Sequence, residues 1–264
     1  MQYLCTIKRA LAVATALFVT APAYSASFVM GDGTPNFSLT NDPPNAAVTS
    51  NQNFFENILG SGTSVGVFDE TVFGAATETV NFYNSLTGVS ASFFSGPITA
   101  ATLSSYDLVA LINLDRIISV AEASALSTYE SNGGTLLLIG DPASVVAQTV
   151  PRLNDLLVKL GSSLVLSTTS ADNGSNSATG AQIDDTTITA GVTNFSYGAA
   201  SQISGGGTPL LRLANGAPFA VYDGPRSDIT IGNTPPPPVP LPAAGWLLLA
   251  GVSTLVFRST KRRT

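Results

Sequence analysis

The sequence predicts an α/β domain, a three-layer sandwich with a mainly parallel sheet of the flavodoxin or amidotransferase type. Leu108–Ile112 and Leu136–Ile139 are short, continuous apolar runs, which are typical of strands buried on both faces of a parallel sheet. Between them, Ser119 stands three residues before Glu122, the capping-box spacing that marks the start of a helix. Asn132-Gly133-Gly134 then provides a left-handed stop. Strand, helix and strand in this order form a βαβ unit.

The segments on either side of this unit continue the alternation of helices and strands. Before it, we expect a helix closed by Gly60, a strand at Ser64–Phe68, a helix at Thr77–Leu86 and a strand at Val89–Phe94. After it, a leucine stripe at i, i+3, i+4 and i+7 predicts an amphipathic helix between Pro151 and Gly161. The remaining expectations are a strand at Ser163–Leu166, a long polar loop at Ser167–Asp185, and short strands at Thr187–Ile188, Leu210–Leu213 and Phe219–Tyr222.

The N-terminal segment, residues 1–26, has the pattern of a secretory signal peptide. Lys8 and Arg9 precede an apolar run, Ala10–Val19, and small residues follow. A buried N-terminal helix is the alternative, but Pro22 and the small residues end the apolar run abruptly. We therefore expect export and cleavage by signal peptidase in a region that contains Ala23, Ser25 and Ala26.

Residues 27–49 are polar and rich in turn-forming residues, so we expect an extended leader that carries at most an edge strand. The folded α/β domain is expected to occupy residues 50–228. One domain of this size is compatible with the chain length of 264 residues.

The C-terminal segment has three parts: a Pro-rich spacer at residues 229–242, an apolar helix at 243–257 and a basic tail at 258–264. Fifteen helical residues span about 22 Å, less than the ~30 Å hydrocarbon core of a membrane. The basic residues that follow favour a cytoplasmic end. This order resembles the VPLPA-type sorting signals of bacteria, relatives of PEP-CTERM, with the motif at Val239, Pro240, Leu241, Pro242 and Ala243. The alternative is a permanent single-span anchor.

Composition and charge exclude several classes of function. The two terminal segments hold six of the 11 basic residues, so the middle of the chain keeps five against all 17 acidic residues, a net charge of −12. A body this acidic repels nucleic acid and anionic membrane surfaces. The sequence has no His, and its single Cys, Cys5, lies in the expected signal peptide. These absences exclude a Ser-His-Asp triad, a Cys-His pair and metal sites built on His or Cys.

The central pattern also resembles the class I glutamine amidotransferase-like superfamily, in particular branches that serve as non-catalytic modules. The resemblance covers roughly Asn51 to Asp223 and rests on three hydrophobic-pattern motifs: Tyr106-Asp107-Leu-Val-Ala-Leu-Ile, Ser119-x-x-Glu122-x-x-x-Leu126-x-x-Tyr129, and Gly133-Gly134-Thr-Leu-Leu-Leu-Ile-Gly140-Asp141. Such motifs specify a fold better than a chemistry. The resemblance implies that a catalytic Cys would lie on the turn after Leu136–Ile139. Here that turn is Gly140-Asp141-Pro142-Ala143, and Ser144 has no base to activate it.

Two carboxylates, Asp141 and Asp115, remain as candidate ligand-binding residues, because ligands of open α/β folds bind at the carboxyl ends of the strands. The alternative is that Asp141 only caps the next segment beside Pro142. Other loop carboxylates could converge to hold Ca²⁺, but none has EF-hand or repeat-type calcium spacing. We therefore expect no catalytic residue, no metal and no cofactor.

Together these observations predict an exported protein, in the cytoplasmic membrane before sorting by an exosortase-type protease and then at the cell surface or in the extracellular matrix. Its α/β domain is expected to bind a partner without turnover, either exopolysaccharide or another surface protein. The alternatives are a secreted carboxylate-dependent hydrolase, with Asp141 as the first residue to suspect, and a permanently membrane-anchored periplasmic binding module.

Overall fold

The structure is a computed structural model that describes residues 26–32, 39, 46–69, 75–172 and 174–224. Its central sheet is built from β1 (Ala26–Met30), β2 (Ser64–Phe68), β3 (Ser90–Phe94), β4 (Leu108–Ile112), β5 (Thr135–Ile139), β10 (Thr208–Arg212) and β11 (Pro218–Asp223). In the described part of the chain these seven strands lie in the order β10-β11-β1-β5-β4-β2-β3. Strands β1 to β5 are parallel, and β11 is antiparallel to both of its neighbours. The predicted α/β class and the mainly parallel sheet are confirmed.

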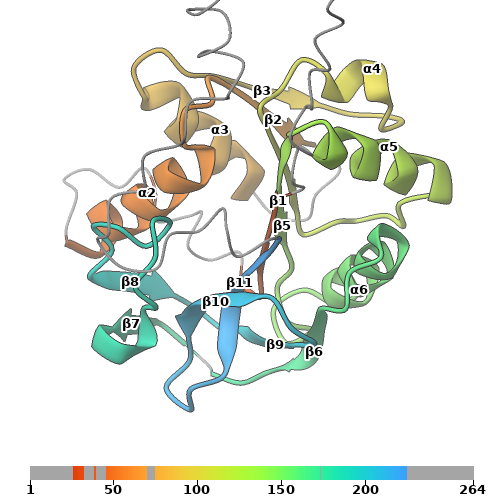
Figure 1. The fold of residues 1–264 in the computed structure, drawn as a ribbon. Coiled ribbons are helices and arrows are strands. Elements are labelled where there is room, and N and C mark those ends of the chain that lie inside the picture. The colour runs from red at the N-terminus through yellow and green to blue at the C-terminus, as the bar shows by residue number, and fades with distance from the viewer. Residues whose placement is uncertain (1–25, 33–38, 40–45, 70–74, 173, 225–264) are drawn as a thin grey trace, which may run out of the picture.

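Helices cover both faces of this sheet, which gives three layers (Figure 1). The helices are α2 (Ala46–Leu59), α3 (Ala75–Ser85), α4 (Ala100–Leu103), α5 (Val120–Ser131) and α6 (Thr149–Leu160). Phe54 of α2 and Tyr83 of α3 pack with one face of the sheet, whereas Leu126 of α5 and Leu153 of α6 pack with the other. Because both faces are covered, the central strands are mainly apolar; all five residues of β4 are apolar and buried.

The βαβ unit at the centre of the sequence forms as predicted. β4 and β5 are adjacent and parallel over their full length, from the pair Leu108↔Thr135 to the pair Ile112↔Ile139. The helix between them, α5, begins with the expected capping box. The Ser119 hydroxyl accepts a hydrogen bond from the Glu122 amide at 3.3 Å, and the Ser119 amide donates to Glu122 Oε2 at 2.9 Å.

The expectation of a leader at residues 27–49, outside the folded unit and with at most an edge strand, is wrong. β1 lies inside the sheet, parallel to β5 on one side and antiparallel to β11 on the other. Val29 is fully buried. The strand is short and stands directly before a polar stretch, and its partners lie about a hundred residues or more away, so no local pattern reveals its place. α2 also begins before residue 50, at Ala46.

The region between α6 and the final hairpin also differs from the prediction. The strand expected at Ser163–Leu166 is β6 (Val165–Ser170), and the expected polar loop contains β7 (Asn176–Thr179) and a short 3₁₀ turn. β6 pairs with β9 (Ser201–Ser204), and β7 pairs with β8 (Asn194–Tyr197), both antiparallel. Residues 187–188 lie in a turn and not in a strand, and the Thr189 hydroxyl on this turn bonds with that of Thr186 at 3.0 Å.

The expected cleavage residues Ala23 and Ser25, and the whole C-terminal sorting segment, lie outside the described residues. Within the residues that are described, no helix has the length and apolar character needed to cross a membrane.

Candidate functional site

The sequence-predicted candidate Asp141 lies at the carboxyl edge of the sheet. It is buried, and its carboxylate is hydrogen-bonded within the protein. Asp141 is only 3% exposed. Its carboxylate oxygen Oδ2 accepts a hydrogen bond from Asn113 Nδ2 at 2.7 Å, and its amide donates to Asn113 Oδ1 at 2.8 Å. The Thr149 hydroxyl donates to the Asp141 carbonyl at 2.6 Å and so ties the turn to α6. The left-handed residue at this edge is Asn113, with φ of 50°, and not Asp141.

The second candidate, Asp115, lies two residues beyond Asn113 and is exposed. Among the described residues no hydrogen bond joins Asp115 to Asp141, and no three His, Cys, Asp or Glu residues gather as they would to hold a metal ion. A third loop carboxylate, Asp184, is paired with Arg212 at 2.9 Å. Within the described residues these carboxylates therefore do not form a metal-binding cluster.

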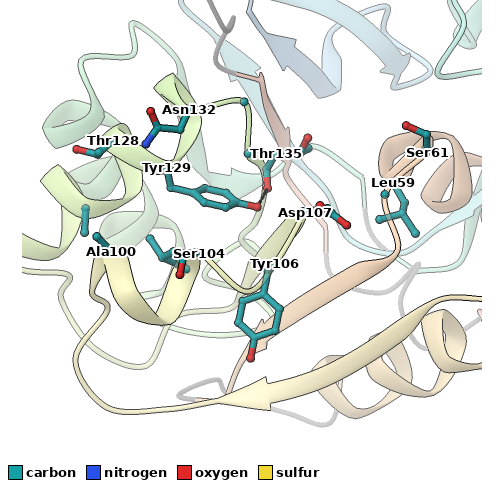
Figure 2. A pocket seen from close by; sticks show the side chains of 15 residues that line it. Leu59, Ser61, Ala100, Ser104, Tyr106, Asp107, Thr128, Tyr129, Asn132 and Thr135 are labelled. Atoms are coloured by element: carbon teal, nitrogen blue, oxygen red, sulfur yellow. Dashed lines mark hydrogen bonds between the residues drawn. The ribbon is translucent and has the colours of Figure 1, made fainter.

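A pocket of about 520 Å³ opens at the opposite, amino edge of the sheet (Figure 2). Its lining comes from the loops that enter three neighbouring strands, β2, β4 and β5, and from the facing sides of α4 and α5. A volume of this size is in the range of small-molecule sites in proteins. The lining residues that bear on its chemistry are Ser61, Tyr106, Asp107, Tyr129, Asn132 and Thr135.

Asp107 is the single carboxylic acid among the described residues that line this pocket. Its Oδ2 accepts hydrogen bonds from the amides of Thr63 and Ser64, at 2.8 and 3.0 Å, and from the Ser64 hydroxyl at 2.8 Å. The Thr63 amide, first, and the Ser64 hydroxyl lower the pKa of Asp107, so its carboxylate is ionised at neutral pH. These bonds fix the carboxylate at the entry to β4 and leave Oδ1 without a protein partner among the described residues.

Two tyrosines form the aromatic part of the lining, and each ring lies where a glycine leaves room for it. A Cβ on Gly66 would lie 2.5 Å from Tyr106 Cδ2, and a Cβ on Gly134 would lie 2.2 Å from Tyr129 Cζ. Real Cβ atoms do not approach other atoms this closely, so both positions require glycine for close approach. Tyr106 is half-buried, stacks on Phe94 with ring centroids 5.6 Å apart, and has its hydroxyl 3.2 Å from that of Ser92.

Several polar groups of the lining keep hydrogen-bonding capacity. In the part of the chain that the structure describes, no hydrogen bond to another protein group engages the side chains of Ser61, Asn132 or Thr135. Figure 2 shows Asn132 at the end of α5, and Tyr129 directed from the same helix toward Thr135. The pocket can therefore offer an ionised acceptor, an amide and hydroxyls. Its described lining has no Lys or Arg, and it has no second carboxylate such as glycoside hydrolysis requires.

No protein-family model and no curated protein matches the chain. Among solved structures, the chain is similar to the structure of MppP soaked with the product 2-ketoarginine, with 14% sequence identity and a TM-score of 0.31. The similarity covers 54% of this chain, which spans 38% of the length of the MppP chain. A likeness this slight carries no argument, so the chemistry of the site is argued from its own residues.

Sequence reasoning directed attention to the carboxyl edge and missed the pocket at the amino edge. A signal for the pocket was present, because Tyr106-Asp107 and Asn132-Gly133-Gly134 both stand directly before a buried parallel strand. Residues in such positions share one edge of a sheet. The pattern alone does not say which of these loops leave space between them.

Proposed function

We propose that this protein is exported, cleaved by signal peptidase, sorted by an exosortase-type protease to the cell surface or matrix, and binds a carbohydrate or protein partner there without turnover. The carrying observation is the pocket at the amino edge, whose described lining combines hydrogen-bonding groups that no other described protein group engages with one carboxylate of lowered pKa. An ionised carboxylate accepts hydrogen bonds from a ligand, and the described lining holds no second carboxyl group to act as its acid partner in glycoside hydrolysis.

The buried, hydrogen-bonded position of Asp141 also supports a function without turnover. The amidotransferase-like resemblance places a catalytic Cys on the turn that here carries Gly140 and Asp141. Asp141 is buried, and Asn113 holds its carboxylate. A nucleophile or general base must reach its substrate, and a side chain held in this way does not.

The activity test uses the full chain exported by a bacterial host and purified in mild detergent. Glycan and peptide panels are screened in parallel for binding and for turnover, with Asp141→Asn as a matched variant. We expect binding with unchanged ligand. Turnover that is lost in Asp141→Asn would instead establish the secreted hydrolase.

The sorting proposal rests on the residues from Val239 to Ala243 and on the apolar and basic segments that follow them. In the native host, deletion of the sorting protease should leave the tail attached and the protein in the membrane. Intact-mass measurement and cell fractionation report both properties. Identical mass and location in the two strains would favour a permanent anchor.

A further inference from the structure

We propose that the pocket at the amino edge of the sheet binds a neutral sugar residue of a polysaccharide, which deepens the proposed binding function and rests on it. The pocket lies between the loops before β2, β4 and β5, and it is lined by Asp107, Asn132, Ser61 and Thr135 with Tyr106 and Tyr129. The chemistry, charge and geometry of this lining each support that ligand class.

The chemistry of the free groups matches the hydroxyl pattern of a sugar ring. Each sugar hydroxyl donates one hydrogen bond and accepts others, so a sugar site needs acceptors and donors on several sides. Oδ1 of Asp107 is an acceptor, the Asn132 amide supplies both kinds of group, and the hydroxyls of Ser61 and Thr135 can serve in either role. Hydrogen bonds to an ionised acceptor are the stronger ones, so Asp107 is the expected anchor for a sugar hydroxyl.

The negative charge of the pocket and of the middle of the chain favours a neutral sugar over an acidic one as the ligand. The described lining contains one ionised carboxylate and no cation, and the middle of the chain has a net charge of −12. An anionic ligand, such as a polyuronate or a phosphate ester, would meet repulsion without a compensating partner. A neutral hexose carries no charge and would not meet this repulsion.

The pairing of the strands next to the pocket favours a sugar over an extended peptide as the ligand. An extended peptide gains most when it adds to an unpaired strand edge. The three strands whose entry loops line the pocket are paired on both sides: β2 with β3 and β4, β4 with β2 and β5, and β5 with β4 and β1. The pocket therefore offers side-chain groups rather than an open ladder of backbone groups.

The expected anchor, Asp107, and the backbone that carries Asn132 are also held in place before a ligand arrives. Asp107 is fixed by Thr63 and Ser64. Asn132 ends α5, and its backbone N–H donates to the carbonyls of Thr128 and Tyr129 at 3.1 and 3.2 Å. Groups that are already ordered lose little entropy on binding, which favours a weak, hydroxyl-rich ligand.

The test measures calorimetric affinities of the full-length exported protein for hexamers of galactose, glucose and mannose, and for a hexamer of galacturonic acid in the same linkage as the galactose hexamer. We expect binding of at least one neutral hexamer and none of the uronate. Asn132→Ala and Asp107→Asn should each weaken that binding about tenfold, because each removes part of the hydroxyl recognition.

A second pair of variants separates blocking of the pocket from misfolding. Thr128 is exposed and lines the pocket, whereas Ser124 lies one turn earlier on the same helix, is also exposed and is outside the lining. Thr128→Trp should abolish sugar binding, Ser124→Trp should retain it, and both should unfold at the wild-type temperature.

The outcomes distinguish this inference from the proposed function. Sugar binding that survives Thr128→Trp, equal binding of the uronate, or binding of peptides alone would overturn the sugar site and leave the binding function standing. Failure of every neutral hexamer to bind would also overturn the sugar site. Cleavage of a bound hexamer that Thr128→Trp abolishes would retain the pocket as a sugar site and overturn the non-catalytic function.

Discussion

Asn113 and Asp141 exchange two hydrogen bonds at the carboxyl ends of β4 and β5, side chain to side chain at 2.7 Å and side chain to backbone at 2.8 Å. Both residues are buried. We predict that Asn113→Ala lowers the free energy of unfolding by about 2–3 kcal/mol, because it removes the amide from a buried carboxylate and the acceptor from a buried N–H group. Urea denaturation measures this change.

The matched control is Asn113→Gly, which suits the left-handed backbone at φ 50° but also lacks the amide. The two variants should differ by about 1 kcal/mol, the cost of a left-handed alanine, and both should be less stable than wild type. A wild-type stability in Asn113→Gly would show that the backbone, and not the hydrogen bonds, determines the effect.

Glu122 should contribute to stability at neutral pH and lose that contribution in acid. Its pKa is lowered to about 2 because the Arg116 guanidinium donates to its carboxylate, with Oε1 at 2.7 Å, and backbone amides add to the effect. The folded pKa lies below the ordinary value of 4.5, so the contribution is complete above pH 4.5 and disappears as the pH falls toward 2.

We therefore predict that Glu122→Gln costs about 2–3 kcal/mol at pH 7 and that the difference from wild type shrinks as the pH falls. Chemical denaturation across this pH range measures it. Asp155→Asn is the control, because Asp155 pairs with Lys159 on the surface with 42% of its side chain exposed, and such pairs contribute about 0–1 kcal/mol. A pH-independent loss in Glu122→Gln would argue against the ion pair.

Glu130 should have the opposite pH dependence. Burial raises its pKa, and the nearby Asp223 raises it further, while the hydrogen bond from the Ser27 hydroxyl lowers it. With the folded pKa above the unfolded value, protonation favours the folded state. This contribution is complete below the unfolded pKa and is lost as the pH rises through the folded one.

Replacement of Glu130 by Gln should therefore raise the unfolding temperature by a few degrees at alkaline pH and change it little at pH 4. Thermal unfolding followed by circular dichroism at several pH values checks this. Equal shifts at both ends of the range would mean that the amide changes packing and that titration is not the cause.

The parts of the fold that the sequence predicts are those with local signals. The capping box from Ser119 to Glu122 and the continuous apolar runs of β4 and β5 are complete within about thirty residues, so the central βαβ unit is predictable. β1 has the same kind of burial, but it is defined by pairing with β5 and β11, about a hundred and two hundred residues along the chain. The signal that identifies β1 as a central strand is therefore non-local.

The candidate site was less predictable than the fold. Asp107 and Asn132 belong to loops separated by a whole strand and helix, and the space between them depends on how α4 and α5 pack. Asp141 stands just after a buried strand, at the sheet edge where open α/β folds bind ligands, and was for that reason the more conspicuous carboxylate. Its partner Asn113 determines that it faces inward, and nothing in the spacing of the two residues reveals this hydrogen bond.

Close packing of Tyr129 over Gly134 should make this glycine intolerant of a side chain. A Cβ at this position would lie 2.2 Å from Tyr129 Cζ, so Gly134→Ala must displace the ring. We predict a loss of about 1–3 kcal/mol, the usual cost of overpacking. In the Tyr129→Ala background, Gly134→Ala should add much less, because the clashing ring is absent. A double-mutant cycle measures the coupling, and additive effects would contradict the contact.

The position of β1 predicts where the mature chain begins. β1 starts at Ala26, which pairs with Thr135 of β5, and it pairs with both neighbours from the next residue: Ser27 lies opposite Leu136 in β5 and Asp223 in β11. Cleavage in the expected region of Ala23, Ser25 and Ala26 leaves these pairs intact. We therefore predict an N-terminus between residues 24 and 26 for the protein isolated from its host, determined by N-terminal sequencing and intact mass.

Truncation separates the role of β1 from that of the residues before it. Expression of the exported chain without residues 24–25 should give a protein with wild-type stability. Removal of residues 26–30 should prevent folding or cause aggregation, because it leaves the facing edges of β5 and β11 unpaired in the middle of the sheet. A stable, soluble protein that lacks residues 26–30, or a native N-terminus downstream of Met30, would contradict the place of β1 in the mature fold. A native chain that still begins at Met1 would contradict the signal peptide itself and leave β1 unaffected.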